Sequence, residues 1–297
     1  MSVVFAMLCW AGAGIAVKEA LGVFSPLTLI ILRFTLAIVL MLLVGVLFRR
    51  HEVLGLQRVD KRDIPLFVLG GLFQPFLYFI FETYTYQSFA SPTIAEAMLS
   101  TQPIMAPILA FIILREKVTR NNVVGILIST MGMLLLLLVG ANNFALGNPW
   151  GVLLAIVTVS MSVGYTIILR RIPTWYSSLS IVFYVQLVAL VLFYAVWGVF
   201  DRQSLQDTIA PLSADLSPVI AVGYLAVFAS VTAFILFCYT VRQIGVTRAN
   251  VFNNVRPVFT ALLMWVIFDE QLPIWKWVGI IVIVIGLFIS QKQRKIE

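Results

Sequence analysis

The stretch TIAEAMLSTQPIMAPILAFIILREKVTRNNVVGILISTMG, residues 93–132, aligns without a gap on TRANVFNNVRPVFTALLMWVIFDEQLPIWKWVGIIVIVIG, residues 247–286. The two stretches lie 154 residues apart, and their matching positions include Thr93/Thr247, Ala95/Ala249, Pro103/Pro257, Glu116/Glu270, Gly125/Gly279 and Gly132/Gly286. The match predicts an internal repeat, with one half at residues 1–140 and the other at residues 147–297.

The composition around this repeat predicts a membrane protein. Hydrophobic residues make up 61% of the chain, charged residues make up 11%, and the mean hydropathy is +1.03, which is outside the range of soluble domains. Apolar runs long enough to cross about 30 Å of hydrocarbon as helices lie at residues 3–21, 27–48, 64–87, 93–114, 123–140, 150–169, 180–200, 216–240, 247–268 and 274–290. We therefore predict an all-α polytopic membrane protein with ten transmembrane helices. The first run has no basic start and no cleavage site, so we expect a retained helix and not a signal peptide.

The positions of the charges predict the topology. The net charge is +7, but the basic residues gather at loops of one parity and at the C-terminus: Arg49, Arg50, Arg58, Lys61, Arg62, Arg115, Lys117, Arg120, Arg170, Arg171, Arg242, Arg248, Lys292, Arg294 and Lys295. The opposite loops contain only Arg202 and Lys276. The positive-inside rule then places both termini in the cytoplasm. The basic excess is a topology signal and does not indicate nucleic acid as a partner.

The number of helices in each half predicts how the halves relate. Because five is odd, the second half enters the membrane from the opposite side, which makes the repeat an inverted one. Inverted repeats are typical of secondary transporters, which bind substrate between repeats and alternate between two mirror-related states. We therefore expect a multi-pass protein of a bacterial inner membrane that works by alternating access.

The same residues carry a family resemblance. Trp10, Lys18, Pro26 and Arg33 come early in the chain, and each half then has a mid-helix proline, a glutamate after that helix (REK and DEQ) and a glycine-spaced final helix. Over essentially its whole length the chain resembles the drug/metabolite transporter superfamily, in particular the ten-helix EamA type. Amino-acid exporters of the aromatic type are the most similar members in general aspect. One departure is Arg256, since family members often have an acidic or apolar residue before the second-half proline.

Polar residues interrupt the apolar runs of the two repeated helices. At about 100° per residue, Asn250, Asn253, Asn254 and Pro257 share one face of the later helix with Arg256 at its edge, while Glu96, Ser100, Pro103 and Pro107 share one face of the earlier helix with Gln102 at its edge. A charge at the helix centre costs at least about 2.5 kcal/mol in lipid, so both faces must meet protein or water. We predict that these residues line a substrate cavity, with Pro103, Pro107 and Pro257 as helix breaks or hinges. Asparagines that join helices are the alternative interpretation.

Other candidate residues lie on neighbouring helices. Trp10 is one of them, and Tyr78 and Glu82 share a face with Gln74, while Tyr165 lies beside Ser162 and Thr166. Glu82 and Glu96 are candidates either for a proton or cation site or for interfacial charges. Arg256 is a candidate partner for a substrate carboxylate or for a glutamate such as Glu96. We expect Glu116 and Glu270 to anchor loops. Lys18 and Arg33 form a mixed set with Glu19, Glu82 and Glu96 near the outer face, where we expect mutual pairing, with substrate contact as the alternative.

Catalytic patterns are not found in the sequence. It has no Cys/His metal spacing and no phosphate-binding loop, and its single histidine is His51 in a charged loop. We expect no catalytic residues, no metal and no cofactor. The prediction is export of an amino acid or similar small metabolite, with protons as a candidate coupling ion and the lipid bilayer as the surroundings. The alternatives are transport of a sugar, nucleobase, organic cation or drug, and, more distantly, a membrane-embedded enzyme.

Overall fold

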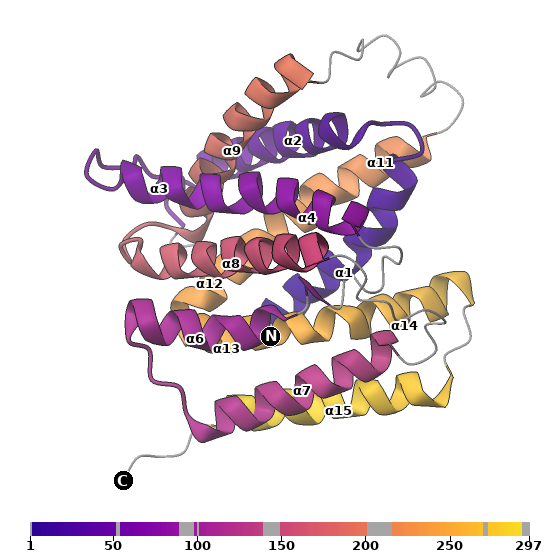
Figure 1. Cartoon of the computed structure of the whole chain (residues 1–297). Coiled ribbons are helices and arrows are strands. Elements are labelled where there is room, and N and C mark those ends of the chain that lie inside the picture. The colour runs from indigo at the N-terminus through magenta and orange to yellow at the C-terminus, as the bar shows by residue number, and fades with distance from the viewer. Residues whose placement is uncertain are drawn as a thin grey trace. The chain divides into compact units, whose positions relative to one another are not determined.

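The computed structural model describes residues 2–51, 54–88, 98–99, 101–138, 149–200, 216–269 and 273–292, and these residues form helices and connecting loops without strands (Figure 1). The chain forms two compact units. Unit 1 comprises Met1–Phe76 and Ile172–Tyr239, and unit 2 comprises Leu77–Arg171 and Thr240–Glu297. Each unit thus draws helices from both halves of the sequence, so the compact units and the sequence repeats are two different divisions of the chain.

Unit 1 is built from helices of the first three and of the seventh and eighth apolar runs. These are α1 (Ser2–Ala20), α2 (Pro26–Leu47), α3 (Ile64–Gly71), η1 (Leu72–Leu77), α9 (Ser178–Phe200), α11 (Ser217–Tyr224), η3 (Leu225–Thr232) and α12 (Ala233–Ile244), of which η1 and α12 continue into unit 2. Helix α2 packs on α9, and α1 packs on α11 and η3. Helix α2 begins at Pro26 because the Ser25 hydroxyl caps it by accepting from the Thr28 amide, and a proline fits the first helical turn.

In unit 1, hydrogen bonds connect segments that lie at the same end of the helices. The Tyr176 hydroxyl donates to Asp63 (2.8 Å) and accepts from the Asp60 amide (2.9 Å). Burial raises the pKa of Tyr176, so the phenol stays protonated at neutral pH and remains a donor to Asp63. At the other end of the helices, Ser217 donates to Glu19 (2.5 Å). Loops that the positive-inside rule assigns to one side therefore meet within this unit.

Unit 2 contains the remaining helices. These are α4 (Tyr78–Ser88), α6 (Gln102–Leu114), α7 (Arg120–Leu138), α8 (Pro149–Arg171), α13 (Val246–Val251), η4 (Phe252–Val255), α14 (Arg256–Phe268) and α15 (Ile274–Gln291). Across both units, six helical segments of the described residues are long and apolar enough to cross a membrane, and Ser2–Val17 and Gln102–Leu114 are shorter apolar helices. The protein is thus an all-helical membrane protein, and the count of ten spans stays a prediction.

Helices α7 and α15 pack closely through glycines. A Cβ at Gly132 would lie 2.7 Å from the Ile283 nitrogen and 2.8 Å from the Gly279 oxygen, and one at Gly125 would overlap Ser290 and Gly286. Residues early in α7 thus meet residues late in α15, so the two helices run antiparallel, side by side (Figure 1). The contacts are reciprocal, because Gly125/Gly279 and Gly132/Gly286 are equivalent pairs in the sequence repeat.

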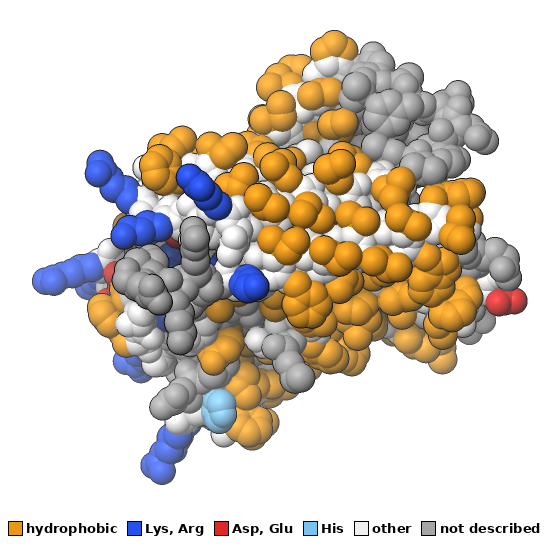
Figure 2. Space-filling view, turned by 90° about the horizontal axis from the view of Figure 1, so that it is seen from below, with side chains coloured by type: hydrophobic (Ala, Val, Ile, Leu, Met, Phe, Trp, Pro, Cys, Tyr) orange, Lys and Arg blue, Asp and Glu red, His pale blue; other side chains and the backbone are white. Residues whose placement is uncertain are grey.

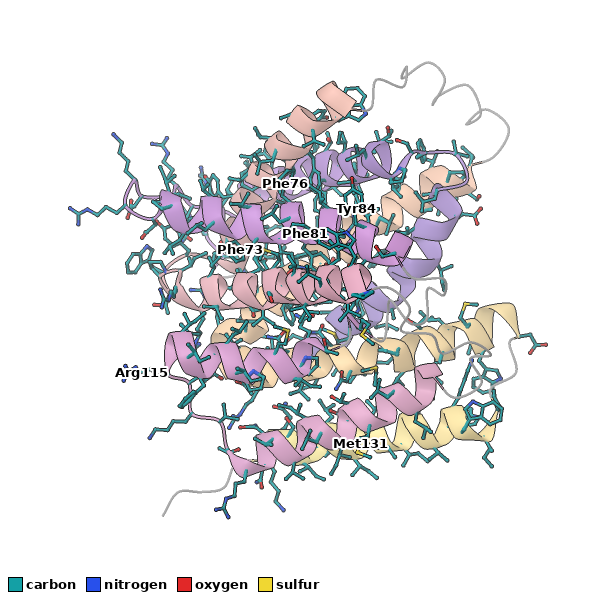
Figure 3. The ribbon with its side chains drawn as sticks, viewed as in Figure 1. Phe73, Phe76, Phe81, Tyr84, Arg115 and Met131 are labelled. Carbon is teal, nitrogen blue, oxygen red and sulfur yellow. The ribbon has the colours of Figure 1, made fainter. Side chains whose placement is uncertain are left out.

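The outer face of this helix pair is apolar. Its exposed side chains are Val123, Val124, Leu127 and Met131 of α7 and Ile281, Ile285 and Phe288 of α15, and Figure 2 shows hydrophobic side chains covering this face, with Lys and Arg at one end. Met131, labelled in Figure 3, is 68% exposed. An apolar band of this kind matches a lipid-facing surface.

The third span, which comprises α3, η1 and α4, is broken in its interior. Gln74 adopts an extended conformation (φ −147°, ψ 122°) next to Pro75, and a proline is a regular cause of such breaks. Phe73 precedes the break, and Phe76, Phe81 and Tyr84 follow it (Figure 3). The prediction that Gln74 shares a helix face with Tyr78 and Glu82 is wrong, because the helical periodicity does not continue through Gln74.

The repeated helices α6 and α14 correspond residue by residue. Each has thirteen residues, and each ends at a left-handed residue, Arg115 (φ 54°) after α6 and Asp269 (φ 52°) after α14. Pro103 and Pro257 lie in the first turn of these helices and not in mid-helix as expected. Backbone N–H groups in the first turn of a helix have no intrahelical acceptor, so a proline there removes no hydrogen bond. Each break therefore lies on the N-terminal side of its proline.

Candidate functional site

A buried polar network joins helices of unit 2. The Gln102 amide nitrogen donates to Asn250 Oδ1 (2.7 Å) and to Ser162 Oγ (2.8 Å), and Asn250 Nδ2 donates to the Val246 carbonyl (2.9 Å) and to Thr166 Oγ1 (3.3 Å). Asn250 is 0% exposed. The network therefore ties α13 to α6 and α8 and, in this conformation, Asn250 is enclosed by protein.

Asn254 belongs to a different contact. It is 1% exposed, and its amide nitrogen donates to Ser129 Oγ (2.9 Å) and Thr130 Oγ1 (3.4 Å) of α7. Asn250 and Asn254 were expected on one face of one helix. They diverge because residues 252–255 form the 3₁₀ turn η4, which advances about 120° per residue instead of about 100°. The helix-joining interpretation applies to both asparagines.

Five of the predicted site residues are only partly buried, namely Trp10 of unit 1 and four residues of unit 2. Tyr78, Glu82, Asn253 and Arg256 keep some exposure. The Tyr78 hydroxyl donates to Glu82 Oε1 (2.8 Å) one turn along α4, and Asn253 Nδ2 donates to Asn250 Oδ1 (3.3 Å) at the margin of the buried network. Arg256 is the first residue of α14, directly after the 3₁₀ turn. Unit 2 thus leaves a carboxylate, an amide and a guanidinium group of the predicted site partly exposed in this conformation.

The other predicted residues are buried or fall outside the description. Tyr165 is 1% exposed in α8, and Pro103, Pro107 and Pro257 are buried. Glu96, Ser100 and Glu270 lie outside the described residues. Unit 2 thus brings Gln102, Asn250 and Asn253 into one network, and it contains Tyr78, Glu82 and Arg256 on helices α4 and α14.

Glu116 anchors a loop, as the sequence predicts. Its carboxylate accepts from the amides of Val246 (3.2 Å) and Thr247 (3.3 Å) at the start of α13. Gly245 precedes this start with φ +89°, and a Cβ there would lie 2.7 Å from Glu116 Oε1. Nearby, Arg170 donates to the Arg242 carbonyl and Arg171 to the Ile113 carbonyl. The ends of α6, α8 and α12 and the start of α13 are therefore tied together.

Unit 1 contains a second polar cluster, around Ser230. Arg33 was predicted as a partner of glutamates, and Gln186 was not predicted as a functional residue. Arg33 is 6% exposed, its Nε donates to Ser230 Oγ (3.1 Å) and its guanidinium lies 5.0 Å from the Phe34 ring centroid. Gln186 Nε2 donates to the Ser230 carbonyl (2.6 Å). The expected pairing of Arg33 with glutamates stays a prediction, and the hydrogen bond to Ser230 is a contact that the sequence did not predict. A lone glutamine in an apolar helix was the signal that could have identified Gln186.

Trp10 belongs to unit 1, whereas the other described site residues belong to unit 2. Its Nε1 donates to the Ala229 carbonyl (3.0 Å), and its ring contacts Phe234 and Phe237 of α12 at centroid distances of 5.3 Å and 5.2 Å. The prediction of Trp10 as a cavity residue stays untested. Its hydrogen bond shows that it also supports the backbone of η3.

Comparison with known proteins gives consistent results. The model of the EamA-like transporter family matches residues 1–138 and again residues 149–291. Relatives include the uncharacterized transporter YetK of Bacillus subtilis (28% identity, covering 89% of this chain and 78% of that protein) and an uncharacterized transporter of Archaeoglobus fulgidus (24% identity, 96% and 95%). A third is the S-adenosylmethionine/S-adenosylhomocysteine transporter of Chlamydia muridarum (26% identity, 89% and 82%).

A solved crystal structure has the same fold. It superposes with a TM-score of 0.79 at 20% sequence identity, covering 97% of this chain and 96% of that one. At this identity the likeness concerns the fold alone. The family match covers most of the chain in two segments, and the named relatives are transporters. The chain therefore belongs to the EamA-like transporter family of the drug/metabolite transporter superfamily, and it is a multi-pass membrane transporter of small metabolites and not an enzyme.

Proposed function

We propose that the protein exports an amino acid, or a similar small zwitterion, across a bacterial inner membrane by alternating access. The observation that carries this proposal is a pair of opposite charges in unit 2. Glu82 on α4 and Arg256 on α14 are both partly exposed within otherwise apolar spans. Ionisable residues inside membrane spans are costly, and they usually mark a substrate or ion pathway.

The chemistry of an amino acid fits this set of residues. An arginine fork binds a carboxylate with two parallel hydrogen bonds, which suits Arg256. A carboxylate such as Glu82, held by the Tyr78 hydroxyl at 2.8 Å, suits an ammonium group. Asn253 adds an amide, and the Tyr78 ring adds an aromatic surface for an amphipathic side chain. A proton moving on Glu82 would supply a coupling ion.

The alternating access that we propose uses two inverted halves, and one contact pattern supports them. The sequence-equivalent helices α7 and α15 run antiparallel with reciprocal glycine contacts. An antiparallel relation between equivalent helices is expected when the second half is inserted upside down. Ten spans, in two inverted sets of five with both termini in the cytoplasm, are the topology that we propose.

A second candidate substrate is an amino acid that carries a larger group. The Chlamydia muridarum relative is named for S-adenosylmethionine and S-adenosylhomocysteine. Both compounds contain an α-amino-acid group, so they need the same carboxylate and ammonium partners as a simple amino acid. Transport of such compounds would keep the roles of Arg256 and Glu82, and it would change only the space that the substrate requires.

Exchange in liposomes tests the proposal. Purified protein is reconstituted, and labelled phenylalanine is exchanged against unlabelled phenylalanine, S-adenosylmethionine, 2-phenylethylamine or 3-phenylpropionate, with empty liposomes as the control. We expect exchange with at least one of the two zwitterions and at least tenfold slower exchange with the amine or the acid alone. Exchange of a labelled sugar or nucleobase, combined with failure of a panel of labelled amino acids, would show that the substrate class is wrong.

A further inference from the structure

The third and eighth spans depart from the α-helix at equivalent positions. Adding the 154-residue offset to η1 (Leu72–Leu77) gives residues 226–231, which lie inside η3 (Leu225–Thr232). The departure in η1 is a break at the extended Gln74, whereas η3 is a continuous π-helical segment. The chain also passes from unit 1 to unit 2 within both spans, after Phe76 and after Tyr239. π-Helical segments are frequent at functional sites. The connection after Phe76 lies within η1, and the connection after Tyr239 lies in α12, which follows η3 directly.

The two segments differ in what maintains them. In η1 the break is built into the covalent structure, because Pro75 has no N–H to continue the helix. In η3 no proline is present, and the flanking Tyr224 and Ala233 have ordinary helical dihedrals. A wide turn without a proline can convert to an α-helix, so something else must hold η3 in its present form.

Three side chains from three other helices hold η3. Trp10 on α1 donates to the Ala229 carbonyl (3.0 Å), and Gln186 on α9 donates to the next carbonyl, that of Ser230 (2.6 Å). Arg33 on α2 donates to the Ser230 hydroxyl (3.1 Å). Gln186 is 0% exposed and Arg33 is 6% exposed. In such surroundings a donor that loses its acceptor is costly, so each hydrogen bond opposes rearrangement of η3.

We infer that η1 and η3 are the paired hinges of the transport cycle, and that Trp10, Arg33 and Gln186 are positioning residues that hold η3 in its π form. The inference rests on the proposed transport by alternating access. A π segment contains one residue more than the α-helix it replaces. Conversion of η3 to α-helix would turn the chain after Thr232 by about 100°. Because α12 follows η3 directly, α12 would rotate by the same angle, and α12 continues into unit 2.

A distance measurement within the eighth span tests the hinge without any substrate. Cys9 and Cys238 are replaced by alanine, and spin labels are attached at Val227 and Tyr239, each 38% exposed, on either side of the end of η3. We expect one distance population in the parent protein and a second population in Gln186→Met, which keeps the side-chain size but removes the donor. Tyr194→Phe is the matched control, because it removes the Thr35–Tyr194 hydrogen bond between α2 and α9 (3.1 Å) without touching η3. Identical distributions in Gln186→Met and the parent would overturn the inference.

Transport kinetics give an independent test. If Gln186 positions η3, Gln186→Met should change the maximal exchange rate about three- to tenfold, as expected for one lost hydrogen bond, and leave KM within about twofold. Tyr194→Phe should leave both constants unchanged. A raised KM with an unchanged rate would assign Gln186 to substrate contact and contradict the hinge. If the wild-type protein exchanges no zwitterion, the proposed function fails, while the distance measurement still decides whether Gln186 holds η3.

Discussion

Two contacts in unit 2 join helices from the two halves of the sequence, and only one of these contacts is symmetric under the repeat. The α7–α15 contact is symmetric, because Gly125 contacts Gly286 and the equivalent residues, Gly279 and Gly132, also contact each other. The Gln102–Asn250 contact is not, because the equivalents of Gln102 and Asn250 are Arg256 and Glu96. Neutral amides in one arrangement thus correspond to a cation and an anion in the other.

The difference separates structure from function. Residues that are identical in both halves allow the helix packing that each half needs, whichever way that half is inserted in the membrane. Residues that have diverged distinguish one side of the membrane from the other, which a transporter with a preferred direction requires. We therefore expect substitutions in the shared glycines to affect stability, and substitutions in the diverged pair to affect the choice of substrate.

The largest effect is expected at the shared glycines. Gly125→Leu should lower the free energy of unfolding by about 3 kcal/mol or more, because overpacking against a rigid backbone is strongly unfavourable, and a Cβ at this site already overlaps Ser290. Gly286→Leu should behave alike. Thermal unfolding in detergent measures the loss. Gly14→Leu is the control, since a Cβ at Gly14 meets no atom within 4 Å. Equal stability of Gly125→Leu and Gly14→Leu would contradict the close packing.

The diverged pair is tested at Arg256. Arg256→Gln should weaken binding of a carboxylate substrate by about 2 to 3 kcal/mol, the range for a hydrogen bond to a charged group, and leave its amide analogue little changed. Isothermal titration with both compounds measures the difference. If both compounds suffer alike, the partner of Arg256 is a protein carboxylate. A second change, Glu96→Gln, should then restore part of the activity, as expected for a broken buried pair.

A smaller effect is expected in the neutral amide pair. Asn250→Leu should destabilise the protein by about 1.5 kcal/mol, near the upper end for hydrogen bonds between membrane helices, because it ends contacts to Gln102 and Thr166. Asn253→Leu removes only one hydrogen bond at the margin, and it should cost about 0.6 kcal/mol or less. Chemical denaturation of the two variants in mixed micelles compares them. A larger loss for Asn253→Leu than for Asn250→Leu would reverse the assignment of structural and accessible asparagines.

The smallest effect is expected at the loop anchor. Glu116→Gln keeps an acceptor for Val246 and Thr247 but loses the charge at the helix start, which is worth about 0.3 to 1 kcal/mol. Glu116→Ala should cost about 1 kcal/mol or more, since it removes the cap entirely. The shift in unfolding temperature orders the two variants. If Glu116→Ala matches the wild type, the carboxylate contributes nothing measurable to the start of α13.

Hydropathy was enough to predict where most of the described helices begin and end. The apolar runs predict most helix ends to within four residues, from α1 at Ser2–Ala20 to α15 at Ile274–Gln291, because burial in lipid acts on the average of many side chains. The offset of 154 residues also predicts which glycines are equivalent. Their reciprocal contact needs the structure, since a sequence match alone does not say which helices touch.

The departures from ideal helices could not be predicted from hydropathy. The break at Gln74, the 3₁₀ turn at residues 252–255 and the π segment η3 each change the helical phase by a fraction of a turn. Such changes move polar residues to new partners, as with Asn254, while leaving the hydropathy unchanged. Trp10, Arg33 and Gln186 meet at η3 from three separate helices, and only the three-dimensional packing brings them together.

The inverted repeat is tested most directly at the two equivalent helix starts. Arg120 and Ile274 are the first residues of α7 and α15, both are exposed, and they are equivalent in the repeat. Single cysteines are introduced at each position in a background without Cys9 and Cys238, and intact cells are treated with a membrane-impermeant thiol reagent. An inverted repeat predicts that Ile274→Cys is labelled from outside and that Arg120→Cys is labelled only after the membrane is permeabilised. Labelling of both positions from the same side would contradict it.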